Sequence, residues 1–384
     1  MSKDTISTDR LIEDIYDCLQ DKEVTPLPQS APKKKKGKRW LKALLAFALL
    51  TVETLVLAVG LLYGVMYVLA KGPSPTARNI FVLSVKETSA VGFLANLFYT
   101  DEEIAEFTAQ QGPEEYVQTD SSLIQIPQKP EQDTPSTNKP QPDAWGLVDE
   151  DRDGIILETI HGEGYNGYMM VVLDPSRVIM GSIPASFGER GYTVEEYVDY
   201  YDAVAGINAG GFYDPEGRGN GSIPDTMVVC GGQTYYANLG CGGGFAGFDS
   251  KHILHVGRFT EQEISQRDIQ YGVGFGPVLV VNGEIASTAL ASGVNPRTAI
   301  GQRSDGAVLM LVVDGRQVTS LGATYRDLAE IMLSFGAVNA CNLDGGSSTM
   351  MWYQDGYVNT CASVVGIRPV PTCFVVLKEG QKNG

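Results

Sequence analysis

The sequence predicts an α+β domain, a mixed and largely antiparallel β-sheet with flanking helices, preceded by a single transmembrane helix and a stalk. Three observations predict it. An apolar run of 28 residues, 43–70, is longer than the roughly 20 residues that cross a bilayer. Downstream, Asn-Gly and Asp-Gly pairs separate β-prone runs, as in hairpins. Two segments with helix-capping signals lie among these runs, and such a mixture is typical of α+β domains.

The apolar run also predicts a topology. Only Glu53 interrupts it, and the segment 33–39 before it is rich in lysine and arginine. Because cytoplasmic flanks carry the excess of positive charge, residues 1–42 are expected to be a cytoplasmic tail. The rest of the chain is then extracellular, and the expected location is the cell membrane, crossed once.

The charge balance excludes one class of partner. Residues 1–42 carry 10 Lys+Arg against 7 Asp+Glu, whereas the remainder carries 19 against 39. A domain this acidic repels polyphosphate backbones, so no nucleic acid is expected to bind. Only three histidines occur, with no HExxH or CxxC pattern, which excludes most histidine-rich metal sites.

Composition divides the outer part of the chain. Residues 71–143 read as a stalk followed by a spacer, since the part from 111 onward contains six prolines among polar residues and is expected to be extended and flexible. Strand and turn signals then fill 144–378, which is long enough for a sizeable core. Residues 379–384 are a short C-terminal tail.

Turn and capping signals locate the elements of this domain. Hairpin turns are expected at Asn282-Gly283, Asp305-Gly306, Asp314-Gly315 and Asp355-Gly356. One helix is expected to start at Thr193, where Glu196 completes a capping box, and another to start near Thr324 and stop at Gly336.

The segments that follow these helices match without gaps. Residues 203–211 (AVAGINAGG) align with 337–345 (AVNACNLDG). Each has a buried strand, an Asn near its end and a glycine turn, so a half-repeat is expected to bring both turns to one rim. Chance similarity is the alternative.

The turn 342–349 is the strongest candidate for chemistry. Asp344 follows a strand and precedes two glycines and three hydroxyls. Turn N–H groups are expected to keep its carboxylate ionised, as a nucleophile, a base or the electrostatic partner of a cationic sugar. An Asx turn is the alternative. In the other turn Asn208 precedes Gly210 and Gly211, whose N–H groups suit an anion, although tight turns explain them equally.

Two arginines are candidates for binding an anion. Arg297, beside Pro296, leads into an apolar strand and offers a planar fork to a phosphate or carboxylate. A structural ion pair is the alternative. Arg316 follows the Asp314-Gly315 turn and reaches either a ligand or solvent.

Two further patterns concern cysteines and calcium. Cys230/Cys241 and Cys361/Cys373 are close pairs that suit two extracellular disulfides, with Cys341 as a buried thiol. The alternative is that all five are reduced. Asp149, Asp151 and Asp153 resemble the start of a calcium loop, but the twelfth position is Ile160, so an acidic turn is favoured over calcium.

At these residues the chain resembles the phosphodiester glycosidase family, the catalytic domain of the enzyme that uncovers N-acetylglucosamine-1-phosphodiesters, with bacterial relatives linked to exopolysaccharide metabolism. The matching elements occur in family-like order over roughly 160–377. They are Ile207 to Phe212, Gly276-Pro277, Asn295 to Gly301, Asp314-Gly315-Arg316, Asn342 to Thr349, and Arg368-Pro369-Val370.

The resemblance implies hydrolysis of a sugar-1-phosphodiester of a cell-surface or exopolysaccharide glycan. Together with the predicted transmembrane helix, it makes the expected protein a membrane-anchored glycosidase, and no metal or other cofactor is expected. Phosphate leaves as a stable anion, so the site needs groups that bind this anion and a carboxylate near the anomeric carbon. The implied catalytic residues are Asp344, Asn208 and Asp314. The implied substrate-binding residues are Gly210, Gly211, Phe212, Arg297, Thr298, Arg316, Gly345, Gly346, Ser347, Ser348 and Arg368. The alternative is a non-catalytic glycan-binding ectodomain on a membrane stalk.

Overall fold

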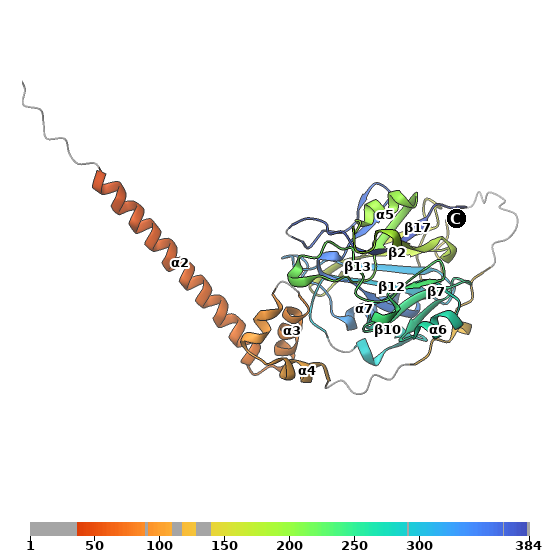
Figure 1. The fold of residues 1–384 in the computed structure, drawn as a ribbon, viewed down its shortest axis with the longest axis horizontal. Helices are drawn as coiled ribbons and strands as arrows, with labels where there is room; N and C mark the ends of the chain where they lie inside the picture. Colours follow the sequence, from red (N-terminus) through yellow and green to blue (C-terminus); the bar gives the residue numbers. More distant parts are fainter. Residues whose placement is uncertain are drawn as a thin grey trace, which may run out of the picture. The chain divides into compact units, whose positions relative to one another are not determined.

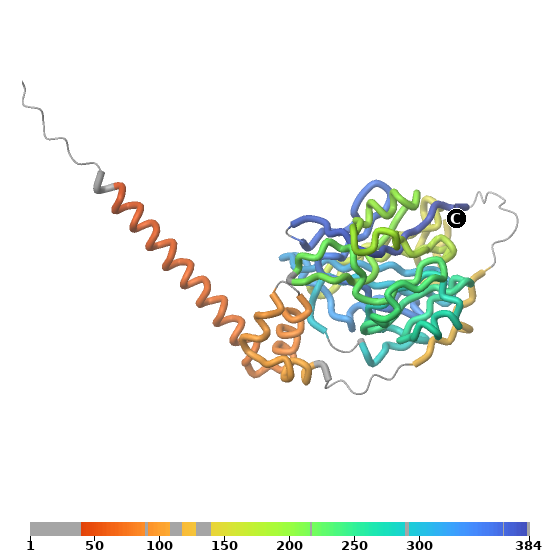
Figure 2. The backbone as a smooth tube through the Cα atoms, viewed as in Figure 1, coloured from red at the N-terminus to blue at the C-terminus, as the bar shows by residue number. Residues whose placement is uncertain are grey.

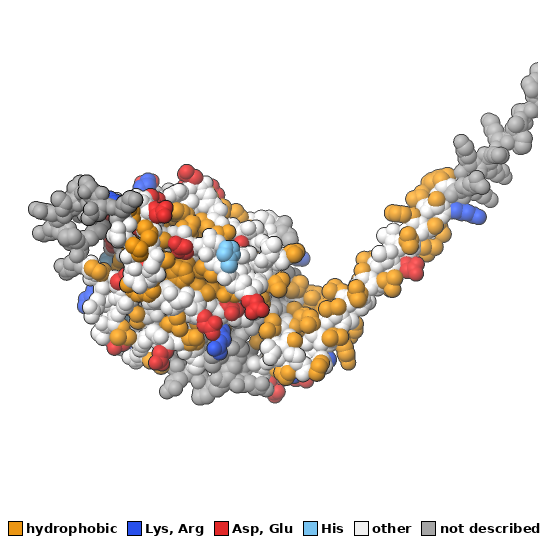
Figure 3. Space-filling model, turned by 180° about the vertical axis from the view of Figure 1, so that it is seen from behind, with side chains coloured by type: hydrophobic (Ala, Val, Ile, Leu, Met, Phe, Trp, Pro, Cys, Tyr) orange, Lys and Arg blue, Asp and Glu red, His pale blue; other side chains and the backbone are white. Residues whose placement is uncertain are grey.

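The computed structural model describes residues 37–88, 91–109, 117–127, 140–289, 292–363 and 365–381. The chain divides into two compact units, residues 1–64 and 65–384. Helix α2 (Gly37–Lys71) accounts for the described part of the first unit and continues into the second. It contains the predicted segment 43–70 and is long and apolar enough to cross a membrane. Figure 3 shows hydrophobic side chains along much of the displayed face of this helix.

The second unit begins with short helices, here called the stalk helices, which are α3 (Pro75–Lys86), η1 (Gly92–Leu97) and α4 (Asp101–Ala109). Ser74 caps α3 by accepting the N–H of Ala77 at 3.2 Å, and Pro75 occupies the first helical turn. The stalk helices share a small apolar cluster formed by Val82, Ala95, Ile104 and Phe107.

Three antiparallel sheets form the domain that follows (Figure 1). The seven-stranded sheet has the order β1 (Ile155–Gly162), β2 (Tyr165–Val172), β13 (Val308–Val313), β12 (Arg297–Arg303), β14 (Ala337–Leu343), β10 (Val278–Val281) and β11 (Glu284–Ile285). One five-stranded sheet has the order β16 (Gly356–Tyr357), β15 (Met351–Tyr353), β4 (Ala203–Asn208), β17 (Thr372–Leu377) and β3 (Val178–Ser182). The other has the order β6 (Gln233–Tyr235), β5 (Val228–Cys230), β9 (Ile269–Gly274), β7 (Phe245–Asp249) and β8 (Leu254–Gly257).

Helices cover the outer faces of two of these sheets. The largest apolar cluster draws side chains from all three sheets and so lies between them, for example Met310 and Phe374. A second cluster joins the seven-stranded sheet to α7 (Tyr325–Ser334), and a third joins β17 and β3 to α5 (Val194–Tyr200). The predicted α+β class with antiparallel sheets and flanking helices is therefore confirmed.

The remaining helices are short. They are α6 (Glu261–Gln266) and the 3-10 helices η2 (Ser121–Leu123), η3 (Pro175–Arg177), η4 (Pro184–Ser186), η5 (Pro215–Gly217), η6 (Ala237–Leu239), η7 (Ser287–Ala289) and η8 (Gly346–Ser348).

The capping signals locate both predicted helices correctly. Thr193 caps α5 and forms a reciprocal capping box with Glu196, and Thr324 caps α7 in the same way with Asp327. Each box satisfies backbone N–H groups that the first helical turn leaves unpaired. Phe335 is the C-cap of α7 and Gly336 follows it with a φ of +84°, which a glycine adopts without strain.

Three of the four predicted hairpins are present, at residues 282–283, at 305–306 and, one residue earlier than predicted, at 354–355. The hairpin expected at Asp314-Gly315 is wrong. Strand β13, which ends at Val313, already pairs with β12 along one edge and with β2 along the other. No edge remains for a returning strand, so the chain leaves the sheet as a loop.

The spacer differs from its prediction where the structure describes it. Much of it lies outside the described residues, but the segment 117–127 packs on the domain instead of extending away from it (Figure 2). Thr119 Oγ1 donates to Val256 O at 2.9 Å and Gln125 N–H donates to Ser304 O at 2.8 Å, while Ile124 is buried. Apolar residues within the proline-rich stretch supply the contact that composition alone does not indicate.

The five described cysteines are free thiols. The two predicted disulfides are therefore not formed, and the alternative that all five are reduced holds. Cys241 lies in the cluster of β5, β7 and α6, where its thiol is 3.0 Å from Phe259 O, whereas the Cys230 thiol lies near Met180 O. The side chains of Cys230 in β5 and of Cys241 in the turn before β7 thus lie in different environments.

Candidate active site

A cavity of about 590 Å³ in the second unit holds most of the predicted site. Ten of the fourteen predicted residues line it: Gly211, Phe212, Arg297, Arg316, Asp344, Gly345, Gly346, Ser347, Ser348 and Arg368. They come from the ends of β4, β12 and β14 and from the loops after β13 and β16. Segments up to about 160 residues apart in sequence thus meet at one place.

The two predicted turns lie together, as expected for the rim. Asn208 Nδ2 donates to Asp344 O at 2.6 Å, and Asp344 N–H donates to Ala209 O at 2.8 Å. The side-chain oxygen of Asn208 accepts from Thr298 Oγ1 at 2.9 Å and from Met350 N–H at 3.1 Å. This amide therefore links three segments beneath the cavity floor.

Asp344 presents its carboxyl group to the cavity. Ser348, in η8 just after the turn, hydrogen-bonds to it. Burial is the main cause that raises the pKa of Asp344 to about 7, with the nearby Asp225 adding to it and Ser348 and Arg368 opposing it. The expectation that turn N–H groups keep this group readily ionised is wrong, because desolvation outweighs the hydrogen bonding. Near neutral pH both of its protonation states are populated.

Arg297 is held by an ion pair in this structure. Its Nη2 donates to Glu87 Oε2 at 2.6 Å and to Gly293 O at 2.7 Å, while Nε donates to Ala323 O at 3.2 Å. The guanidinium also lies 4.1 Å from the centre of the Tyr325 ring. Glu87 immediately follows α3, so the first stalk helix delivers a carboxylate to the predicted anion-binding residue.

Arg316, unlike Arg297, forms no ion pair with a carboxylate of the described residues. Its Nη2 donates to Thr88 Oγ1 at 2.9 Å and to Asn295 Oδ1 at 3.3 Å, and no carboxylate pairs with it among the described residues. Burial lowers the pKa of Arg316, and the positive charge of Arg297 adds to this effect. A Cβ on Gly346 would lie 3.3 Å from Nη2, so the glycine turn and this guanidinium approach closely.

Arg368 forms a bidentate pair with Asp214, at 2.7 and 2.8 Å, and lies 4.8 Å from the centre of the Phe212 ring. Such forks are rigid and specific. The guanidinium still lines the cavity, and its positive charge acts on Asp344.

Four predicted residues lie outside the cavity lining. Asn208 and Thr298 are fully buried and bond to each other, so the geometry does not support contact of Asn208 with sugar or water. Gly210 packs against Val273 and Thr372. Asp314 is buried and accepts the N–H of Thr360 at 3.0 Å and Nδ2 of Asn359 at 3.3 Å, so its carboxylate orders the chain after β16.

Sequence reasoning missed four side chains that shape the cavity: Glu87, Asp214, Asp225 and Tyr325. Asp214 lies six residues after Asn208, close enough to its motif to have been considered. Glu87 and Asp225 stand in segments without any catalytic pattern, and only tertiary contacts identify them.

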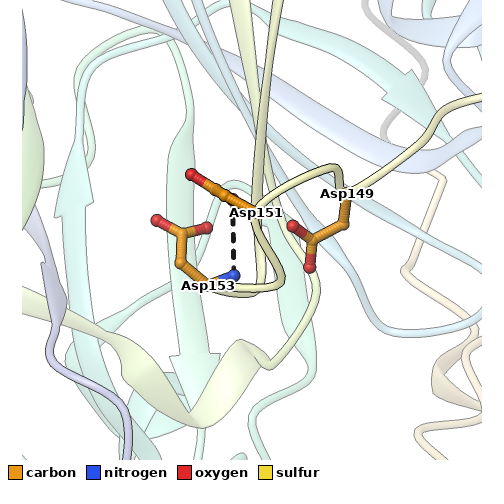
Figure 4. A group of neighbouring side chains, drawn as sticks. All are labelled: Asp149, Asp151 and Asp153. Atoms are coloured by element: carbon orange, nitrogen blue, oxygen red, sulfur yellow. Dashed lines mark hydrogen bonds between the residues drawn. The ribbon is translucent and has the colours of Figure 1, made fainter. Parts of the chain in front are cut away.

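The acidic triplet lies in a turn away from this cavity (Figure 4). Carboxylate oxygens of Asp149, Asp151 and Asp153 lie within 4.8 Å of one another. Asp149 accepts N–H groups of Arg152 and Gly154, and Asp153 accepts from Ile155 N–H and from Tyr353 Oη, both at 2.8 Å. The predicted acidic turn is present, and calcium binding there stays a prediction.

Part of the chain matches the model of a known protein family. Residues 201–377 match the model of the phosphodiester glycosidase family. A curated relative, an uncharacterized SPbeta prophage-derived protein of Bacillus subtilis (strain 168), is 46% identical over 81 residues, which are 21% of this chain. The match spans only 13% of that relative's length.

Three solved structures are similar. The zebrafish N-acetylglucosamine-1-phosphodiester alpha-N-acetylglucosaminidase catalytic domain, auto-inhibited by its pro-peptide, has a TM-score of 0.49 at 19% identity, covering 59% of this chain and 82% of its own. A hypothetical protein from Synechocystis has a TM-score of 0.43 at 15% identity, covering 59% and 62%. A putative exported protein from Burkholderia pseudomallei K96243 has a TM-score of 0.43 at 16% identity, covering 56% and 74%.

Proposed function

We propose that the phosphodiester glycosidase domain of residues 201–377, completed by neighbouring segments, hydrolyses a sugar-1-phosphodiester and releases the free sugar. The observation that carries the proposal is the cavity itself. The lining brings Asp344 together with Arg297, Arg316 and Arg368. This reaction requires an anion-binding site for the phosphate beside a carboxylate.

The chemistry follows from the leaving group. Cleavage of the bond between the anomeric carbon and the phosphate oxygen leaves positive charge on the sugar ring. Phosphate accepts the bonding pair and is stabilised by fixed cations, so no strong acid is needed to protonate it. The carboxylate of Asp344 stabilises the cationic carbon, and preorganised charges of this kind act strongly in a partly desolvated cavity.

Arg316 is the first candidate to hold the phosphate, because it faces the cavity beside the Gly346 turn without a carboxylate partner in the described part of the chain. Arg297 is the second. A substrate phosphate must compete with Glu87 for this guanidinium, since their ion pair is formed in the structure.

The location of the reaction belongs to the same proposal. Helix α2 would anchor the protein in a cell membrane by a single crossing, with the basic tail inside and residues 71–384 outside. Its substrate would then be a GlcNAc-1-phosphodiester or similar group of a cell-surface or exopolysaccharide glycan. Protease added to intact cells should remove the outer domain and leave the tail, and protection of the outer domain would contradict this orientation.

The activity is tested with the full-length protein in detergent micelles. Incubation with a GlcNAc-1-phosphodiester that carries a small alkyl group should release GlcNAc and an alkyl phosphate, both quantified by mass spectrometry. Asp355→Asn, which alters an exposed turn remote from the cavity lining, is a matched control and should keep the activity. Ligand binding without release of sugar would contradict the proposal and favour a binding module.

A further inference from the structure

Asp225 lines the cavity, and its carboxylate makes few interactions that stabilise the fold. Asp214 holds Arg368 in a bidentate pair, and Asp344 is hydrogen-bonded by Ser348. Asp225 is exposed within the cavity lining, and among the described residues only its own backbone N–H hydrogen-bonds to its carboxylate. Structural pairing therefore does not account for a carboxylate at this position.

Backbone pairing places Asp225 beside the turn that holds Asp344. The segment 211–213 runs along 223–225, joined by a β-bridge and by backbone hydrogen bonds of 2.8 and 3.3 Å. Two residues before this segment, Ala209 O accepts the N–H of Asp344 at 2.8 Å. The two aspartates therefore flank one short stretch of backbone after β4.

Gly211 makes room for this carboxylate. A Cβ at position 211 would lie 2.8 and 2.9 Å from the two oxygens of Asp225 and 2.9 Å from the Phe275 ring. Such distances are too short for ordinary contact, so the side chain of Asp225 lies directly against the turn. The need for glycine here comes from close approach to a carboxylate.

Asp225 also affects the protonation of Asp344. The negative charge of Asp225 raises the pKa of Asp344. The other charged groups that act on Asp344 are Arg368, which lowers its pKa, and Asp214, which raises it. A like charge near Asp344 makes its ionisation less favourable, so the two carboxyl groups act at one site.

We propose that Asp225 is a second catalytic carboxylate, which takes the proton of the water that attacks the sugar. The inference rests on the proposed function. As the water oxygen bonds to the anomeric carbon, the carbon–oxygen bond to phosphate breaks and its electron pair leaves with the phosphate oxygen. One water proton passes to Asp225 and later to solvent, so a phosphodiester monoanion becomes a free sugar and a phosphomonoester.

The division of labour follows from the surroundings of each group. Asp344 is tied to Ser348 and lies beside the guanidinium of Arg368, which suits electrostatic or nucleophilic work at the anomeric carbon. Asp225 lines the same cavity, and its carboxylate keeps lone pairs that no other described residue uses, which suits binding of a water molecule. A base is needed whether water attacks the sugar directly or attacks a covalent intermediate on Asp344.

The test uses full-length protein and the alkyl GlcNAc-1-phosphodiester. Asp225→Asn should lower kcat by about 10²–10⁴, the usual contribution of a positioned base, with little change in KM. Because a negative charge next to Asp344 is lost, the acid limb of the residual pH–rate profile should move to lower pH. Asp355→Asn should change neither quantity.

Azide gives a readout that a structural role would not produce. In Asp225→Ala, azide attacks without deprotonation, so it should restore turnover and yield the sugar azide. A kcat near that of the wild type in Asp225→Asn, or a folded Asp225→Ala protein that azide fails to rescue, would overturn the role of Asp225 while leaving the proposed function intact. Absence of turnover by the wild-type protein would overturn the proposed function, and the role of Asp225 with it.

Discussion

Two helix–strand–turn units of the domain have the same local architecture but different tasks. The first of these helix–strand–turn units comprises residues 193–211, and the second comprises residues 324–345. Each starts with a threonine-capped helix, α5 or α7, and continues into an interior strand of its sheet, β4 or β14. Each strand carries a buried asparagine, Asn208 or Asn342, whose Nδ2 donates to the carbonyl of another loop, at 2.6 and 2.7 Å respectively.

The units differ two residues further on, where Gly210 in the first corresponds to Asp344 in the second. Gly210 faces Val273 and Thr372, which leave no space for a side chain. Asp344 faces the cavity. The comparison teaches that the repeated backbone provides two rigid supports, while the space in front of each turn decides which one carries a reactive group.

The largest expected effect comes from removing that group. Asp344→Asn should lower kcat by about 10²–10³ or more, since the charge that stabilises the cationic sugar is lost while the shape is kept. Activity and thermal unfolding are measured together, with Asp355→Asn as control. Turnover close to the wild-type value would remove Asp344 from the mechanism, and loss of the fold along with activity would make the turn a structural one.

The asparagines sharpen the comparison. Asn208→Ala leaves Thr298, the Met350 N–H and the Asp344 carbonyl without their partner, and should lower the free energy of unfolding by about 3 kcal/mol. Asn342→Ala should cost less, about 1–2 kcal/mol, because the side-chain oxygen of Asn342 has no hydrogen-bond partner among the described residues. Urea denaturation measures both variants, and equal losses would contradict the asymmetry.

The raised pKa of Asp344 predicts that the free energy of unfolding depends on pH. In the folded protein this pKa is about 7, above the ordinary value near 4, so the folded state binds the proton more tightly than the unfolded state. The stabilisation is complete below about pH 4 and is lost as pH rises toward 7. Asp344→Asn should therefore be more stable than the wild type by up to about 4 kcal/mol at pH 8, with the gap closing near pH 4.

Urea titrations at the two pH values measure this gap. The same comparison on Asp355→Asn, which alters an exposed turn residue, is the control. A gap for Asp344→Asn that stays constant across the range would contradict the assigned pKa.

The smallest effect concerns the stalk helices. Glu87→Gln keeps the shape but removes the charge that competes for Arg297, so KM for the phosphodiester should fall several-fold, whereas Arg297→Lys should raise it by loss of the fork. Glu102→Gln, an exposed residue of α4, is the matched control. An unchanged KM in Glu87→Gln would mean that Arg297 serves only the ion pair.

The sequence by itself determined the features that depend on neighbouring residues. An apolar run of sufficient length forms a long helix, a threonine followed three residues later by an acidic side chain starts one, and Asn-Gly or Asp-Gly closes a hairpin when an edge is free. Local chemistry also identified the turn at Asp344 and the order of the family motifs, because glycines, hydroxyls and a carboxylate are recognisable wherever the turn is placed.

The tertiary structure decided which side chains, distant in sequence, lie next to one another. Glu87 meets Arg297 across 210 residues, and Asp225 meets the other turn only because 223–225 runs beside 211–213. Asn208 and Asp314 belong to recognisable motifs, yet packing buries both behind the cavity. The physical reason is that burial and charge pairing depend on the whole chain, since desolvation and partners across the fold set whether a polar group is a support, a competitor or a reactant.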